Sequence, residues 1–402
     1  MDHVLVAGGS HSEIPLIDAL HNMGYYVITT GNNPDGLGHK AADKYEPGDF
    51  SDPDWVLSLA KKHSVKGIVA GCNDFSYLSV AYACEKLGIP GHDTYETART
   101  IHHKEQFRSL LKKCDLPAPK HLCVSDAKEL PAAIAELGFP LLIKPVDLTG
   151  GKGVNICNNE DDMRIAFAAA MQSTREDFVI AEQMIIGENH GASALISRGK
   201  VVFVFFDNEE YYLNKYLVSG ANSPAKLTDS VKQNIIRQFE SVAKNAHLTD
   251  GLFHSQCIVN GENAYMIDPC RRAPGDLYIK LVEYSAGISY PEAIVRAELG
   301  LPFENLVPSP DNAYSCIARE CIMTDGNGIY ENYAINPELE KFVMDRLVWA
   351  KRGEPITDYL KYKAGIVFFK FPDQITMQTQ LERIHENMTI TRTKAVVENG
   401  IE

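Results

Sequence analysis

Residues 141–154 (LLIKPVDLTGGKGV) place a lysine at the end of an apolar run and a glycine-rich loop directly after it. The branched apolar residues predict a strand that ends near Lys144. Gly150, Gly151 and Gly153 predict a loop whose backbone N–H groups can point at one anion, because glycine tolerates positive φ. The stretch therefore indicates phosphate binding, and it leaves a glycine-rich β-hairpin turn open as the alternative. It is not a Walker loop, because Lys152 is followed by glycine and not by serine or threonine.

Residues 178–184 (FVIAEQM) predict a second apolar strand, which carries Glu182 near its end. A strand that continues into an extended segment can offer backbone C=O and N–H groups to the edge of an adenine ring. The carboxylate of Glu182 can accept a hydrogen bond from the exocyclic amine of that ring. The segment is compatible with an adenine site, although on its own it favours an ordinary strand end.

A hairpin predicted over residues 254–268, with its turn around Asn260, Gly261 and Glu262, carries residues suited to a metal. Side chains alternate between the faces of a strand, so Asp268, Cys270 and Arg272 are expected to share a face. If the turn contains an odd number of residues, Gln256 lies opposite or diagonal to Asp268 on that face. Asp268 and Gln256 could then hold a Mg²⁺ that bridges triphosphate oxygens, with Arg272 neutralising charge on the transferred phosphoryl group. The alternative is a solvated hairpin face with a surface Arg–Asp pair.

The first 93 residues alternate between predicted strands (3–7, 25–30, 67–70) and predicted helices (14–23, 54–63, 76–87), as in a parallel α/β sheet. Ligands of such sheets lie beyond the carboxyl ends of the strands. The candidate substrate contacts at those ends are Ser10, His11, Asn33, Asn73 and Asp74. Ordinary turn chemistry is the alternative for all five. The first turn, Gly8-Gly9-Ser10-His11-Ser12-Glu13, does not match the dinucleotide fingerprint, so NAD binding there is weakly supported.

Composition bounds the partners of the chain. Its 402 residues carry a formal net charge of -14, without a run of lysine and arginine, which argues against a nucleic-acid or anionic-membrane partner and favours small-molecule substrates. The nine cysteines form no Cys-x-x-Cys pair, so neither a disulfide framework nor a structural zinc site is expected, and a reducing cytoplasm is the expected location. No stretch of 18 apolar residues occurs, so no membrane span is expected.

The ordered set of these features resembles the ATP-grasp superfamily, and within it the carboxylate-amine ligases and biotin-carboxylase-like enzymes, including L-amino acid ligases and the carbamoyl-phosphate synthetase large subunit. The resemblance covers roughly residues 1–300 and rests on Lys104, Lys144 with Gly150 and Gly151, residues 182–185, Gln256, Asp268, Cys270 and Arg272. It implies an α/β fold, α+β in the ATP-binding part. The parts implied are an N-terminal Rossmann-like domain (1–93), a linker helix (94–116), an ATP-grasp domain with a small lid subdomain (117–184) and a larger subdomain (185–305), and a C-terminal α+β domain (306–402). Within that last domain the pattern predicts a helix over residues 338–350.

The resemblance also implies roles for single residues. Lys104 and Lys144 would touch ATP phosphates, with Lys144 and Arg272 as the catalytic pair. The flap over the phosphates would comprise Gly150, Gly151, Lys152 and Gly153. The base and ribose would be held by Glu182, Gln183, Ile185, Glu188, Asn189 and His190, and Gly275 and Asp276 would line the acceptor pocket.

The metal positions depart from the family pattern, which has Glu, Glu and Asn where this chain has Gln256, Asp268 and Cys270. A thiol is a poor ligand for hard Mg²⁺, so either one metal suffices or the usual activity is weakened. The expected cofactors are ATP and Mg²⁺ or Mn²⁺. The expected activity is that of an ATP-dependent carboxylate-amine (amino acid) ligase that acts through an acyl phosphate. The alternatives are a bicarbonate-activating enzyme of the same superfamily and an ATP-binding module without catalysis. The expected partners are a small carboxylate and an amine, and a homodimer is compatible with the resemblance.

Overall fold

The computed structural model describes residues 1–148, 151, 153–303 and 316–393. The chain divides into two compact units. Unit 1 comprises residues 1–206, 226–283 and 288–307, and unit 2 comprises residues 207–225, 284–287 and 308–402. None of the helices in the described ranges is long and apolar enough to cross a membrane.

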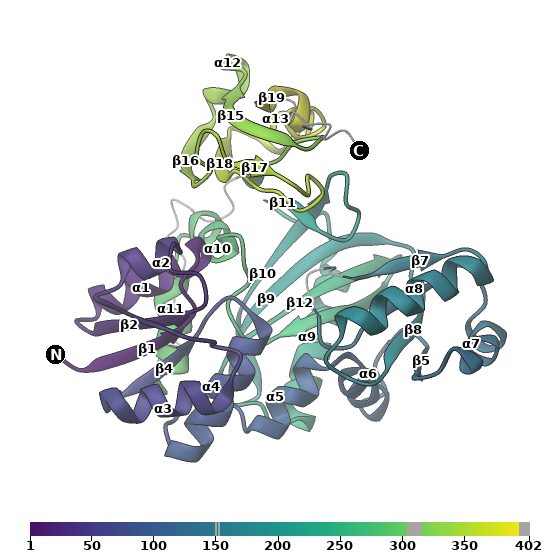
Figure 1. Cartoon of the computed structure of the whole chain (residues 1–402), viewed down its shortest axis with the longest axis horizontal. Helices are drawn as coiled ribbons and strands as arrows, with labels where there is room; N and C mark the ends of the chain where they lie inside the picture. Colours follow the sequence, from purple (N-terminus) through teal and green to yellow (C-terminus); the bar gives the residue numbers. More distant parts are fainter. Residues whose placement is uncertain (149–150, 152, 304–315, 394–402) are drawn as a thin grey trace, which may run out of the picture. The chain divides into compact units, whose positions relative to one another are not determined.

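Unit 1 begins with a four-stranded parallel sheet in the order β3-β2-β1-β4, which confirms the predicted parallel α/β sheet. Its strands β2, β1 and β4 are labelled in Figure 1. Val4 to Ala7 of the central strand are fully buried, because helices cover both faces of such a sheet. The strands are β1 (His3–Ala7), β2 (Tyr26–Gly31), β3 (Lys44–Pro47) and β4 (Gly67–Ala70), and the helices are η1 (His11–Glu13), α1 (Ile14–Asn22), α2 (Leu37–Ala41), α3 (Pro53–His63) and α4 (Asp74–Leu87).

The predicted linker helix consists of two helices, α5 (Tyr95–His102) and α6 (Lys104–Lys113). His103 separates them in an extended conformation, with φ −99° and ψ 121°. The N–H of Lys104 donates to the C=O of Val146 at 3.5 Å instead of continuing α5, so a tertiary contact ends the helix. The break makes Lys104 the first residue of α6.

A small antiparallel sheet in the order β5-β8-β6-β7 follows. Helices α7 and α8 bury Leu130, Ala133, Met163 and Ala166 in one cluster with Leu141 and Ile143 of this sheet. The elements are β5 (His121–Val124), η2 (Ala127–Glu129), α7 (Leu130–Leu137), β6 (Leu141–Pro145), β7 (Asn155–Cys157), α8 (Glu160–Ser173) and β8 (Val179–Gln183).

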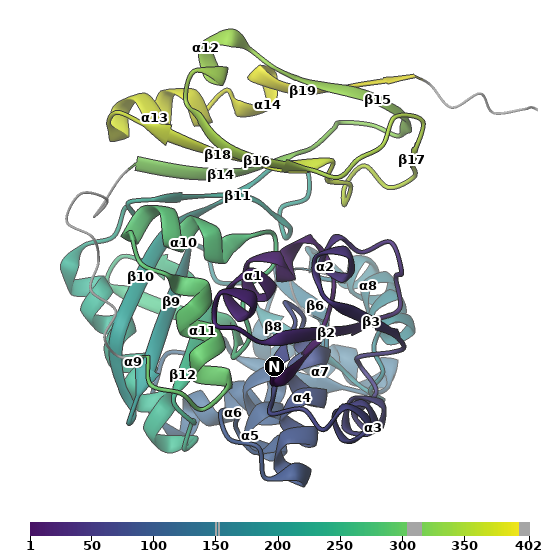
Figure 2. The same ribbon diagram turned by 90° about the vertical axis from the view of Figure 1, so that its left-hand side faces the viewer.

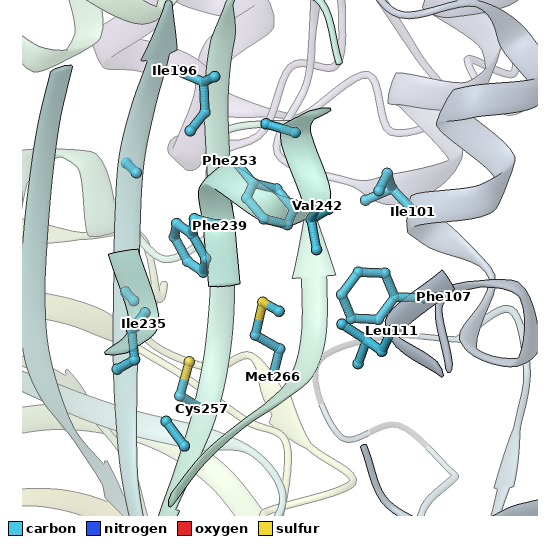
Figure 3. Close-up of a cluster of buried hydrophobic side chains, with 14 of the residues drawn as sticks. Ile101, Phe107, Leu111, Ile196, Ile235, Phe239, Val242, Phe253, Cys257 and Met266 are labelled. Atoms are coloured by element: carbon cyan, nitrogen blue, oxygen red, sulfur yellow. The ribbon is translucent and has the colours of Figure 1, made fainter. Parts of the chain in front are cut away.

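The larger antiparallel sheet of unit 1 has the order β13-β12-β9-β10, and β12, β9 and β10 run side by side in both views (Figures 1 and 2). Its core packs Phe239 of α9 against Phe253 of β12, with ring centroids 4.7 Å apart, and adds Ile101, Phe107 and Leu111 from α5 and α6 (Figure 3). The apolar faces of α5 and α6 are therefore fixed to this sheet. The elements are β9 (Glu188–Ser197), β10 (Lys200–Tyr211), α9 (Asp229–Asn245), β12 (Gly251–Asn260), β13 (Asn263–Cys270), α10 (Tyr278–Ala286) and α11 (Tyr290–Glu298).

Unit 2 contains the C-terminal end of β10, which pairs with β11, and the strands that follow in the order β14-β18-β16. A second sheet has the order β17-β15-β19. The helix predicted over 338–350 is wrong: α12 ends at Glu340, and residues 343–348 form a strand that pairs with β18. The elements are β11 (Val218–Ser223), β14 (Cys316–Ile322), β15 (Gly328–Ile335), α12 (Pro337–Glu340), β16 (Val343–Val348), β17 (Pro355–Ile356), β18 (Gly365–Phe371), α13 (Gln374–Leu381), α14 (Ile384–Asn387) and β19 (Met388–Thr393).

Candidate functional site

Lys144 lies on β6 and is 3% exposed. Its Nζ donates to Glu182 Oε1 of β8 at 2.5 Å, and Arg108 Nε of α6 donates to Glu182 Oε2 at 3.0 Å. Burial lowers the pKa of Lys144 to about 8, although Glu182 acts in the opposite direction. Burial alone would raise the pKa of Glu182, but Arg108 and Lys144 outweigh it and hold that pKa at about 2. One buried carboxylate thus pairs with two buried cations, and the cluster keeps a net positive charge.

Lys104 connects this cluster to the hairpin. Its side chain is 6% exposed, and its Nζ lies 3.5 Å from Asp268 Oδ1 of β13. The same Nζ donates to the C=O of Leu148, at the entry to the glycine-rich loop. The charge of Lys104 also lowers the pKa of Lys144, as expected for two ammonium groups that lie near one another. Two lysines from different elements therefore converge beside the loop that follows β6.

The glycine-rich loop joins β6 to β7, which pair as an antiparallel hairpin with Ile143 opposite Asn155. Gly151 and Gly153 have φ values of +74° and +72°. A Cβ on Gly153 would lie 2.8 Å from Pro145 Cγ, so this position needs glycine on both counts. Gly150 and Lys152 lie outside the described residues. The loop is thus a hairpin connection, and the two lysines beside it distinguish it from a plain turn.

The hairpin of β12 and β13 places Gln256 directly opposite Asp268, on the face that the sequence predicts. The turn itself contains two residues, Gly261 and Glu262, and not an odd number. A β-bulge next to Gln256 supplies the shift, since Cys257 pairs with Met266 and leaves Ile267 unpaired. Met266 consequently faces the apolar core while Asp268 faces Lys104, although residues two apart in a regular strand share a face.

The bulge is held by Arg108, which the sequence analysis does not single out. Its NH1 donates to the C=O of Met266 at 3.3 Å and its NH2 to the C=O of Ile267 at 2.8 Å. Arg108 stands four residues after Lys104 on α6, so the two side chains lie on the same helix face. That spacing is a sequence signal that could have identified it.

The donor set suits one Mg²⁺ and not the full three-residue pattern. Asp268 offers a carboxylate and Gln256 an amide oxygen, both of which are ligands that Mg²⁺ accepts. Cys270 is 3% exposed, burial raises the pKa of its thiol to about 12, and its Sγ donates to the C=O of Arg272 at 3.5 Å. A neutral thiol fits a magnesium site poorly. Within the described ranges, no three His, Cys, Asp or Glu side chains gather in a way that could hold a metal.

Arg272 is anchored by Asp74, the first residue of α4, through NH2 to Oδ2 at 2.9 Å. Asp74 Oδ1 lies 2.7 Å from Nδ1 of His102, the last residue of α5. Burial would raise the pKa of Asp74, yet Arg272 and His102 hold that pKa well below its usual range. Asp74, predicted as a substrate contact, is 5% exposed and is placed to orient Arg272. The Nε of Arg272 is buried, and no partner for it occurs among the residues that the structure describes.

The predicted substrate contacts separate into two groups. His11 and Asp276 converge, with Nε2 and Oδ1 3.8 Å apart, and the N–H of Asp276 donates to Ser12 Oγ at 2.9 Å. A Cβ on Gly275 would lie 4.0 Å from Ser12 Oγ and 4.0 Å from the carbonyl oxygen of Cys72. The loops that follow β1 and β4 therefore meet the segment after β13.

Three other predicted contacts are engaged in turn and cap chemistry. Ser10 caps η1 in a capping box with Glu13, which also accepts from the N–H of Cys72 at 2.7 Å. Asn73 caps α4 by accepting from the N–H of Phe75 at 3.0 Å, and the exposed Asn33 accepts from the N–H of Asp35 at 3.1 Å. The turn-chemistry alternative accounts for these side chains.

The predicted adenine and ribose contacts follow β8. The N–H of Gln183 donates to the C=O of Lys120 at 2.8 Å, and Ile185 is half-buried in the segment after the strand. Glu188 and Asn189 are exposed at the start of β9. His190 is 2% exposed, with Nε2 3.7 Å from Glu188 Oε2. Residues 183–190 directly follow Glu182, the partner of Lys144, in the sequence.

Sequence reasoning missed His254 as well. It is 6% exposed, pairs with Cys270 across the hairpin and lies with its ring centroid 5.0 Å from that of Tyr278. Burial and the charge of Arg272 lower its pKa to about 3, so the imidazole is neutral. It lies two residues before Gln256 on β12, and that alternation could have placed it on the face of the metal-site residues.

Residues 109–261 match the family model of the ATP-grasp domain. The chain is similar to the solved structure of phosphoribosylglycinamide synthetase from Anaerococcus prevotii, with 21% sequence identity, a TM-score of 0.77, and 98% of this chain and 100% of that chain covered. It is similar to L-amino acid ligase from Bacillus licheniformis, with 16% identity, a TM-score of 0.80, and coverage of 98% and 99%.

A third similar structure is the biotin carboxylase domain of 2-oxoglutarate carboxylase from Hydrogenobacter thermophilus, solved in complex with MgADP, ADP and bicarbonate. The identity is 17%, the TM-score is 0.77, and 98% of this chain and 91% of that chain are covered. At these identities the structural similarity establishes the fold, and the matched family model agrees with the resemblance inferred from the order of the motifs. Residues 109–261 therefore match the ATP-grasp domain, within a fold that the chain shares with these three enzymes.

Proposed function

We propose that the protein is an ATP-dependent ligase that joins a carboxylate, such as that of an amino acid, to an amine. One observation carries the proposal: Lys104 and Lys144 converge at the entry to the glycine-rich loop, with Asp268 3.5 Å from Lys104. Two buried ammonium groups beside a metal-type carboxylate suit a triphosphate with its divalent cation. The proposal keeps the domain boundaries expected from the sequence: an N-terminal domain (1–93), a linker helix (94–116), an ATP-grasp domain (117–305) and a C-terminal domain (306–402).

In the proposed reaction the substrate carboxylate attacks the γ-phosphate of ATP, which forms an acyl phosphate and releases ADP. The amine then attacks the acyl carbon, phosphate leaves, and the amine proton is released. The protein supplies no covalent nucleophile, so its residues act by position and charge. Lys104 would exchange its contacts to Leu148 and Asp268 for phosphate oxygens, and Lys144 would add a second cation.

Magnesium would be held by Asp268 and Gln256, and when bound it would neutralise charge on the phosphates. Arg272 would direct its Nε toward the acid, since Asp74 already occupies its NH2. The loops that bring together His11, Ser12 and Asp276 support an acceptor pocket at the same place. Glu182 would receive the adenine amine only by sharing oxygens that Lys144 and Arg108 already use.

A second candidate, an ATP-binding module without turnover, is favoured by the buried, neutral thiol of Cys270 at a metal position. The two are separated by measuring ADP release with Mg-ATP and a panel of amino acids, singly and in pairs, and with bicarbonate alone. Hydroxylamine in the same reactions traps an acyl phosphate as a hydroxamate.

The ligase proposal expects ADP and hydroxamate only when an acid is present, and an amide product when an amine is added. ADP release with bicarbonate alone would instead assign the bicarbonate-activating alternative. ATP binding without ADP release on any substrate would assign the binding module. Asp268→Asn serves as the control that separates this turnover from contaminating ATPase, because it removes the sole carboxylate among the predicted metal ligands.

A further inference from the structure

Unit 2 contains a row of acidic and amide side chains around Gly220 of β11. Gly220 pairs with Glu210 of β10 on one side and with Glu320 of β14 on the other, so the three positions share a face of the sheet. A Cβ on Gly220 would lie 2.1 Å from Glu320 Oε2. The side chain of Glu320 therefore lies across the glycine, in space that any other residue would fill.

Glu320 is fully buried, with an exposed fraction of 0%. Neither of its carboxylate oxygens has a hydrogen-bond partner among the residues that the structure describes. Burial and the charge of Glu210 raise its pKa well above the usual range, and Arg319 opposes them only in part. A buried carboxyl group without a donor is costly, so this position calls for a partner that brings N–H groups or positive charge.

The neighbouring amides of Asn208 and Asn222 do not supply enough N–H donors for the two glutamates of the row. Asn208 Nδ2 donates to Asn222 Oδ1 at 2.8 Å, and Asn222 Nδ2 donates to Glu210 Oε1 at 2.9 Å. This chain of amides supplies one N–H to Glu210 and none to Glu320. Asn208 and Asn222 are buried, whereas Glu210 is exposed. The row thus runs from an exposed carboxylate to a buried one.

We propose that the Glu210–Gly220–Glu320 row binds a protonated amino group, –NH₃⁺, with Glu320 as the buried acceptor and Glu210 at the exposed end. An ammonium group carries three N–H donors and a full charge. Its charge would favour loss of the Glu320 proton, so that Glu320 accepts as a carboxylate across the glycine from Glu210. A divalent metal fits less well, because the described residues contain no group of three His, Cys, Asp or Glu side chains that could hold one. This site is independent of the proposed ligase reaction.

The proposal is tested by calorimetric titration of the full chain with methylammonium chloride. Tetramethylammonium chloride at the same ionic strength is the control, because it carries the charge without N–H donors. We expect methylammonium to bind and to raise the melting temperature, and tetramethylammonium to do neither. Equal effects of the two salts would show nonspecific charge screening and would overturn the proposal.

Three variants locate the binding. Glu320→Gln keeps the shape of the side chain and removes its charge, and we expect at least tenfold weaker methylammonium binding. Glu210→Gln should also weaken binding, and since residue 210 is exposed, it keeps the test decisive if the Glu320 variant does not fold. Glu209→Gln is the matched control, because Glu209 pairs with Ala221 in the next row, on the opposite face. Unchanged binding in both the Glu320 and Glu210 variants would refute the assignment.

The source of the amino group is separated by comparing ammonium chloride with glycinamide. Binding of ammonium alone would identify the free ion as the ligand. Binding of glycinamide at least as tightly would identify the amino group of an organic molecule. Failure of both, with the wild-type chain folded, would contradict the proposal, while the ADP-release assay reports on the ligase reaction separately.

Discussion

Lys144→Met tests the nucleotide site most directly, because Lys144 is buried and its ammonium donates a hydrogen bond to Glu182. A charge-assisted hydrogen bond to phosphate is worth about 1.5 to 3 kcal/mol, so the affinity for Mg-ATP should fall about tenfold to a hundredfold. Isothermal titration calorimetry measures this fall directly. Methionine fills a similar apolar volume along β6, which limits packing changes.

The cost in folding stability should be modest, because Glu182 keeps Arg108 at 3.0 Å after Lys144 is removed. We expect a loss of about 1 to 3 kcal/mol in the free energy of unfolding, measured by urea denaturation. Arg108→Met removes three contacts at once and should cost more, about 3 to 5 kcal/mol, as for a broken buried ion pair. The comparison separates lost stability from lost phosphate binding.

Lys128→Met is the matched control, since Lys128 is 90% exposed and lies on η2, outside the cluster. It should change neither affinity nor stability. The reasoning is refuted if Lys144→Met binds Mg-ATP as tightly as the wild type while folded. It is also refuted if the wild type binds neither ATP nor ADP with magnesium present.

Three further predictions concern pH, metal and the acceptor side. Burial lowers the pKa of Lys144 to about 8, so ATP affinity should fall by up to about tenfold per pH unit above pH 8, whereas Lys144→Arg should hold its affinity there. The contribution of Lys144 to folding stability has the opposite sign: between pH 8 and about 10.4 the unfolded chain binds more protons at this residue, so that contribution rises with pH in denaturation curves. Asp268→Asn should reduce ADP release by orders of magnitude, and Cys270→Asn should lower the magnesium concentration needed for half-maximal rate; unchanged metal dependence in both would reject the metal assignment. Asp74→Asn should raise the KM for the acid about tenfold while the dissociation constant of ATP stays constant, and an equal loss for both ligands would contradict its role in orienting Arg272.

The sequence predicts the N-terminal sheet well, because strands such as Val4–Ala7 are continuous apolar runs bounded by glycine turns, and both features are local. It also predicts that Gln256 and Asp268 share a face, which is confirmed. The odd-numbered turn on which that prediction rests is wrong, because a bulge and not the turn sets the register. The turn is even, and the bulge that corrects the register depends on Arg108, which is remote in sequence.

Other errors have the same origin in tertiary contacts. The linker helix expected over 94–116 is broken at His103, where the N–H of Lys104 donates to the C=O of Val146. Residues 343–348, expected to be helical, form a strand because they pair with β18, which is remote in sequence. The sequence predicts Asp74 as a substrate contact because it follows the end of a strand. Its pairing with Arg272 spans nearly two hundred positions of the chain, so no local pattern indicates it.

The bulge at Gln256 and Cys257 has a consequence for how this hairpin can change in length over evolution. Because the side-chain period of a strand is two, a one-residue insertion or deletion between 257 and 266 would turn either Gln256 or Asp268 away from the shared face, unless the bulge is lost at the same time. Length changes by two residues in the turn leave the pairing parity intact. The tip of this hairpin can therefore change in length by two residues, whereas the strands beneath it accept a single-residue change only if the bulge is lost with it.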